Sequence, residues 1–151
     1  MADNKAKQTN EQTPQPSPDL KSLEKLVGTW EVTGEAQGTS TYQWVEGGFF
    51  LTQHIDLVVQ GKKLKATEFI GHENKLGQEL GKEIKSSLFS FLDGMTWNYV
   101  YELEGDTLRI WAGEKGSPAQ FNGKFSADGS SYSGEWVFPG GGYKATATKI
   151  K

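Results

Sequence analysis

One predicted strand has a glutamate on its apolar face, and this residue has the clearest chemical potential in the chain. Leu64, Ala66, Glu68 and Ile70 share one face in a period-two pattern, and His72 follows with the same parity. A carboxylate facing a protein interior is desolvated, and its raised pKa suits a general acid or an acceptor for a ligand hydroxyl. The alternative is structural: a bulge turns Glu68 outward, or a buried partner such as a tyrosine satisfies it. We favour the structural alternative.

Two further polar residues interrupt predicted strands. Gln53 could orient a ligand through hydrogen bonds or satisfy a backbone group. Arg109 is the single arginine among 16 basic residues and lies in mid-strand between Leu108 and Ile110. Facing inward, its guanidinium could hold a ligand carboxylate through two parallel hydrogen bonds. The alternation favours the outward orientation, in which Arg109 and Trp111 stack on a solvated face.

Aromatic residues recur on the predicted inner face. They could line a pocket for a flat or apolar ligand, with phenol and indole groups as its polar contacts. Any one of them is better explained as filling of the interior, but together they support a cavity, because ten-stranded barrels leave room that side chains do not fill. The set comprises Tyr42, Trp44, Trp97, Tyr99, Tyr101, Trp136 and Tyr143.

Other kinds of chemistry find little support. His54 and Asp56 share an outer face, but the chain has only 2 histidines, so a surface pair explains them better than a metal site. The absence of cysteine excludes disulfides, thiolate catalysis and sulfur-ligated metals. The glycines at 140–142 follow a proline and precede a strand, so no helix N-terminus stands behind them to bind phosphate.

Net charge and hydropathy limit the kinds of partner that the protein can have. The net charge of −3 creates no general attraction to nucleic acid or to an anionic membrane surface. The first residues lack the apolar segment of a secretory signal, and no apolar run is long enough to span a bilayer. A cytoplasmic protein without nucleic-acid or membrane partners is therefore expected.

Composition divides the chain into an arm and one domain. Residues 1–17 are rich in Asn, Gln, Thr and Pro and predict a disordered arm, and residues 18–151 predict a single domain. A short helix over residues 18–27 opens the domain, with Ser17 as N-cap, Pro18 at the first position and Asp19 in the first turn. Its apolar stripe must pack on something, and a barrel opening is a natural surface. The stripe consists of Leu20, Leu23, Leu26 and Val27.

From Gly28 onward the hydrophobic period is two, and glycine-containing turn signals recur at even intervals. They predict about ten short antiparallel strands, and closure into an up-and-down barrel is the economical way to hide the sheet edges. A two-sheet sandwich is the alternative, with residues 74–82 as the segment long enough for a crossover. The strand over residues 84–92 has apolar residues on both faces, so both faces are covered there or a bulge switches them. Turns are predicted at Gly38, Gly47-Gly48, Gln60-Gly61, 77–81, Asp93-Gly94, Gly105-Asp106, 113–116, Asp128-Gly129 and 140–142.

A short helix that runs into Gly28-Thr29-Trp30 resembles the Gly-x-Trp entry of lipocalins and other calycins. The wider pattern is similar to a bacterial family of lipocalin-like barrels of unknown function, and it covers roughly residues 20–150. The resemblance implies a calycin-type barrel around a pocket and transfers no catalytic residue. The pattern continues through Tyr42-x-Trp44-x-x-Gly47-Gly48-x-Phe50-Leu51, Phe69-Ile70-Gly71, Phe121-x-Gly123-x-Phe125-Ser126-x-Asp128-Gly129 and Gly134-x-Trp136.

The chain also resembles, more distantly, the nitrobindins, whose haem is held by a histidine late in the chain. The last predicted strand here, 143–149, contains no histidine, so haem is not expected. No other cofactor is expected either.

Three functions follow from these residues. The leading hypothesis is a barrel that binds a small hydrophobic or aromatic molecule in its lumen. The second is an enzyme that uses Glu68 as acid or base with a tyrosine or Arg109 as electrostatic partner. The third is a structural or interaction protein with a filled barrel, forming a homodimer through its outer face. The predicted ligand-binding residues are Tyr42, Trp44, Gln53, Glu68, His72, Trp97, Tyr99, Tyr101, Arg109 and Trp136.

Overall fold

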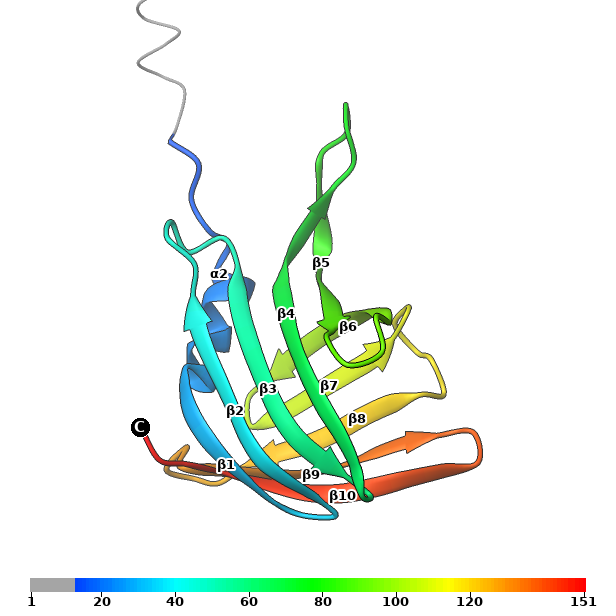
Figure 1. The fold of residues 1–151 in the computed structure, drawn as a ribbon. Coiled ribbons are helices and arrows are strands. Elements are labelled where there is room, and N and C mark those ends of the chain that lie inside the picture. The colour runs from blue at the N-terminus through cyan, green and yellow to red at the C-terminus, as the bar shows by residue number, and fades with distance from the viewer. Residues whose placement is uncertain (1–12) are drawn as a thin grey trace, which may run out of the picture.

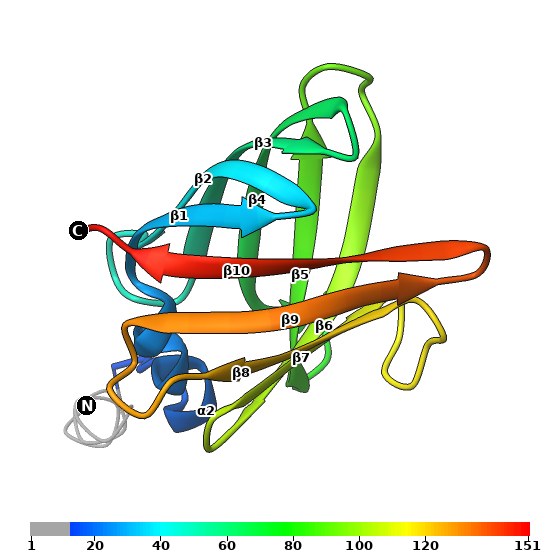
Figure 2. The same ribbon diagram turned by 90° about the horizontal axis from the view of Figure 1, so that it is seen from below.

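The computed structural model describes residues 13–151, so most of the predicted arm lies outside the described residues. Ten strands form a closed barrel in which each strand pairs antiparallel with the next, and β10 pairs with β1 (Figures 1 and 2). The predicted up-and-down barrel is confirmed. Residues 75–79 connect β4 to β5 as a hairpin, which rules out the sandwich. The strands are β1 Gly28–Gly34, β2 Ala36–Trp44, β3 Leu51–Val59, β4 Lys62–Asn74, β5 Leu80–Ser90, β6 Thr96–Glu104, β7 Thr107–Ala112, β8 Gln120–Phe125, β9 Ser131–Phe138 and β10 Gly141–Lys149.

A short helical segment precedes the barrel, as predicted. It consists of α2 (Pro18–Lys21) and a 3₁₀ turn, η1 (Ser22–Leu26), which leads through Val27 into β1 (Figures 1 and 2). Its three leucines, at positions 20, 23 and 26, are at most 1% exposed and belong to the main core of the barrel. The segment therefore closes one end of the barrel by burying its apolar stripe there.

The predicted capping role of Ser17 is wrong. Ser17 precedes α2 in an extended conformation, but its hydroxyl makes no capping hydrogen bond and donates instead to the Asp19 carboxylate. Asp19 itself accepts a hydrogen bond from the backbone N–H of Leu20, at 2.9 Å. Since this carboxylate already satisfies a free N–H of the first turn, the serine hydroxyl is available for another contact.

Gly28 and Trp30 join this helical segment, β1 and the C-terminal residues. Gly28 has φ of 131°, and a Cβ atom at this position would lie 2.5 Å from the backbone oxygen of Lys151. The indole N–H of Trp30 donates to the carbonyl of Leu26 at 2.8 Å, and the side chain is fully buried. The Trp30 ring packs edge-on against Tyr132, with 5.0 Å between centroids. The entry motif thus serves to close the barrel and to attach the helix.

Two local predictions need correction. Gly38 lies inside β2 rather than at a turn, and the first hairpin turns between Gly34 and Ala36. A Cβ atom on Gly38 would lie 2.1 Å from the backbone oxygen of Asp56, so the glycine permits close approach of β3. On β5, one face is buried inside the barrel, while Phe89 on the other face is 44% exposed. Neither predicted explanation of this strand, two covered faces or a face-switching bulge, is correct.

Candidate functional site

The interior of the barrel contains a cavity. Its volume is about 1060 Å³, and it opens at the end opposite the helical segment, between the turns that join β3 to β4, β5 to β6 and β9 to β10. This volume is sufficient for a small organic ligand, since ligand pockets typically enclose about 300 to 1,000 Å³. Seven predicted site residues line the cavity: Tyr42, Gln53, Glu68, Trp97, Tyr99, Tyr101 and Trp136.

The other three predicted site residues lie outside the cavity lining. Trp44 donates its indole N–H to Glu24 of η1 at 2.8 Å. Arg109 is exposed on the outer face of β7, because Leu108 and Ile110 occupy the inner face. His72 contacts the start of α2. The structure therefore brings neither a guanidinium nor an imidazole into the lumen.

Trp111 shares the outer face with Arg109, but that part of the face is not solvated. The Trp111 side chain is only 5% exposed, and the Lys115 ammonium lies 5.7 Å from the centroid of its ring. Lys115 also donates to Glu102 at 2.7 Å. The predicted stacking of Arg109 with Trp111 on a solvated surface is therefore wrong. Lys115, in the loop between β7 and β8, lies over the Trp111 ring instead, and its contact with Glu102 of β6 helps to hold it there.

Glu68 faces the barrel interior and is 1% exposed. Its strand register places it opposite Gln53 on β3 and opposite Leu88 on β5. Ser86 donates a hydrogen bond to Oε2 at 2.5 Å, and Tyr101 donates one to Oε1 at 2.7 Å. The predicted tyrosine partner is therefore present, and no bulge turns the carboxyl group outward.

Burial raises the pKa of Glu68 to about 7, although the hydrogen bonds from Ser86 and Tyr101 act in the opposite direction. Burial also raises the pKa of Tyr101, and the negative charge of Glu68 raises it further. Burial likewise raises the pKa of Tyr143 to about 12. Near neutral pH the lumen thus contains neutral phenols and one buried carboxyl group that is partly protonated, whereas the other carboxyl group of the described lining, Asp93, is exposed in the turn between β5 and β6.

Two buried serines bind the polar residues of the lumen, and neither was predicted as a site residue; Ser40 lines the cavity. Gln53 donates from Nε2 to Ser40 Oγ at 2.7 Å, and Ser86 is the second partner of Glu68. Both serines are at most 5% exposed. Strand parity could have found them, because Ser40 alternates with Tyr42 and Ser86 lies between Ile84 and Leu88.

The mouth of the cavity combines exposed apolar side chains with charges. Met95, Trp97 and Phe138 line it and are 49%, 37% and 40% exposed. Lys62 and Lys63 are the cationic residues among the described lining residues, and both lie at the start of β4, at the mouth. Glu68 is thus the ionisable carboxyl group in the depth of the lumen.

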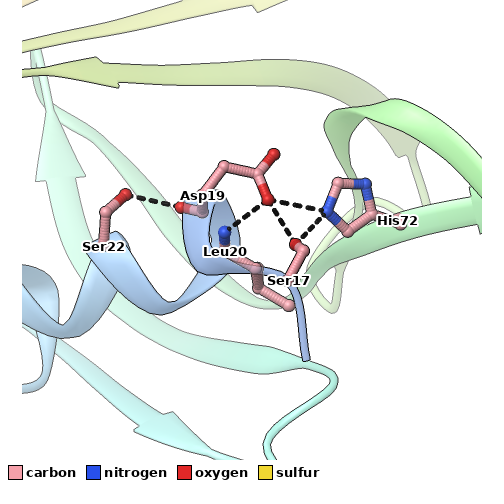
Figure 3. Close-up of polar contacts among 5 residues, drawn as sticks. All are labelled: Ser17, Asp19, Leu20, Ser22 and His72. Atoms are coloured by element: carbon pink, nitrogen blue, oxygen red, sulfur yellow. Dashed lines mark hydrogen bonds and ion pairs between the residues drawn. The ribbon is translucent and has the colours of Figure 1, made fainter. Parts of the chain in front are cut away.

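A second polar cluster joins α2 to β4 at the closed end (Figure 3). Ser17 Oγ lies 2.8 Å from His72 Nε2, and Asp19 Oδ1 lies 3.4 Å from the same nitrogen. His72 Nδ1 is buried and has no hydrogen-bond partner among the described residues. In a nucleophilic serine triad the acid binds the other ring nitrogen and the serine donates to the histidine. The arrangement here instead attaches the helix to the barrel.

The remaining polar candidates are exposed. His54 Nδ1 lies 3.2 Å from Thr67 Oγ1, and Asp56 lies 3.9 Å from the Lys65 ammonium. Within residues 13–151 no three acidic or histidine side chains gather into a group that could hold a metal ion. In the same part of the chain, no helix is long and apolar enough to cross a membrane.

No protein-family model matches the sequence, and no curated protein matches it.

Proposed function

We propose that the protein is a lipocalin-like, calycin-type barrel that binds a small hydrophobic or aromatic molecule in its lumen. The observation that carries the proposal is the cavity of about 1060 Å³, open at one end and lined by aromatic side chains. Rings of Tyr99 and Trp136 lie 5.7 Å apart on its wall. A flat apolar ligand would displace water from these rings, which favours binding. The Gly28-Thr29-Trp30 entry supports the calycin assignment by resemblance.

Binding can be tested with the neutral dye N-phenyl-1-naphthylamine, whose fluorescence rises in an apolar site. The wild-type protein should bind the dye with saturation. Ala112→Trp, on the cavity wall, should weaken binding at least about tenfold by filling the space the dye needs. Lys124→Trp, at an exposed position of β8, is the matched control and should bind as the wild type does. Absence of saturable binding, or equal binding by Ala112→Trp, would contradict the proposal.

An acid–base enzyme is the second candidate, because a carboxyl group with a pKa of about 7 lines the cavity beside Tyr101. Arg109 has no part in it, since it lies on the outer face. To test this candidate, small molecules found to bind the protein should be incubated with it, recovered and analysed by mass spectrometry for a change in mass. Unchanged ligand supports the binding function, whereas conversion by the wild type but not by Glu68→Gln supports the enzyme.

A further inference from the structure

The charges along the cavity wall are unevenly distributed. The cationic side chains of the described lining, Lys62 and Lys63, are exposed at the mouth. Burial raises the pKa of four tyrosines, and the charge of Glu68 raises it further, so their phenols stay neutral near physiological pH. These phenols belong to Tyr42, Tyr99, Tyr101 and Tyr132. An anion in the depth of the lumen would thus meet a carboxyl group and no compensating cation.

Glu68 retains acceptor capacity despite its two partners. Each carboxylate oxygen can accept about two hydrogen bonds, and here Oε1 accepts one from Tyr101 and Oε2 accepts one from Ser86. Glu68 itself lines the cavity. Tyr101 and Ser86 therefore do not exhaust the acceptor capacity of the carboxylate, and a donor group on a ligand could share it.

The aromatic wall suits a cation as well as an apolar body. Tyr99 and Trp136 are in edge-to-face contact, and Trp97 extends the aromatic surface toward the mouth. The faces of such rings attract an ammonium group, and the attraction is strongest where water is excluded.

We propose that the lumen selects a cationic amine with an aromatic or apolar body, whose ammonium group lies against the carboxylate of Glu68. The inference rests on the proposed binding function and specifies its ligand class. The proton balance is simple: the amine enters protonated, and Glu68, where it is neutral, releases its proton to solvent. Because burial raises the pKa of Glu68 to about 7, amine binding should weaken as the pH falls below that value.

Three probes with one ring system isolate the effect of charge: 1-naphthylmethylamine, 1-naphthylmethanol and 1-naphthoate. Isothermal titration of the full chain at about pH 8 should show the amine binding about tenfold or more tighter than the naphthoate. Between about pH 8 and about pH 6, amine affinity should fall by about tenfold, while the affinity of the alcohol stays constant. Titration in buffers of different ionisation enthalpy should detect the released proton.

Glu68→Gln should bind amine and alcohol alike and lose the pH dependence. Glu31→Gln, at an exposed position of β1, is the matched control and should retain both properties. Suppose that the wild type binds the alcohol, but binds the amine no more tightly than the alcohol and no more tightly than the naphthoate. The inference is then overturned, and the binding function stands. If the wild type binds none of the three probes, both fail. The comparison among probes requires no variant, so it is decisive even if Glu68→Gln does not fold.

Discussion

The two ends of the barrel are filled in different ways. At the closed end, Leu23, Leu26 and Trp30 are fully buried and pack into one core. Toward the open end, Tyr99 and Trp136 are half-buried around a cavity, and Trp97 is 37% exposed at its mouth. Aromatic side chains are abundant in both regions, so amino-acid composition does not explain the difference. The helical segment explains it, because this segment supplies the apolar side chains that fill one end of the barrel only.

The polar clusters of the two regions differ as well. In the lumen, burial raises the pKa of Glu68, so the folded state favours its neutral form. At the closed end, burial acts to raise the pKa of Asp19, but hydrogen bonds from Ser17 and Leu20 and the nearby His72 outweigh it and lower this pKa. The two carboxyl groups should therefore affect stability in opposite directions as the pH changes.

The largest expected difference between the two ends is in stability. Trp30→Ala should lower the free energy of unfolding by about 3 to 5 kcal/mol, because it leaves a cavity in a complete core. Trp97→Ala should cost about 1 kcal/mol or less, because its ring already faces the open mouth. Urea unfolding followed by circular dichroism measures both. Similar losses for the two variants would show that the ends are equally packed.

The next largest effect is the pH dependence produced by Glu68. Its pKa is about 7 in the folded protein against an ordinary 4.5, so the folded state binds more protons between these values. The stability it contributes is fully present below about pH 4.5 and is lost as the pH rises through 7, by about 3 kcal/mol in total.

Urea unfolding of Glu68→Gln across this range should lack the loss, and the variant should exceed the wild type in stability at about pH 8. Glu31→Gln should follow the wild type. A wild-type stability that does not fall between pH 4.5 and about 8 would mean that the Glu68 carboxyl is better solvated than its burial indicates.

The smallest effect is expected at the closed-end cluster. Asp19 is 49% exposed at the side chain, so Asp19→Asn should cost at most about 1 kcal/mol at neutral pH. Because the folded pKa of Asp19 is lowered, its contribution should be present above the ordinary value of 3.8 and disappear as the pH falls through the folded value. Asp56→Asn, on the exposed surface, should change stability less. A cost for Asp19→Asn that persists in acid would contradict the role of the charge.

Much of the fold could be predicted because its signals are local. Period-two alternation, glycine turns and one amphipathic segment are sufficient to predict a ten-stranded barrel with a helix at its start. Gly38 shows the limit of this inference. In the sequence, this residue resembles a turn signal. In the structure, a glycine is required because the backbone of Asp56 on the next strand approaches it closely, and no local sequence pattern reveals that approach.

The site was predicted in part for the same reason. Parity placed Glu68 inside, and a tyrosine was an expected partner, but the pairing of Glu68 with Tyr101 and Ser86 joins three strands. His72 has the same parity as Glu68, but it lies under the helix rather than in the cavity. Strand parity specifies a face of the sheet and not a depth along the barrel.

By itself, the sequence determined most of the strands and their inward faces, because backbone sterics and alternation act between neighbouring residues. It also excluded cysteine chemistry, because the chain has no cysteine. The tertiary structure alone decided that the lumen is hollow at one end and that Trp111 is covered, whereas alternation had already favoured the outward orientation of Arg109. These outcomes depend on which side chains meet across the closed sheet, and that is set by strand register and by where the helix packs.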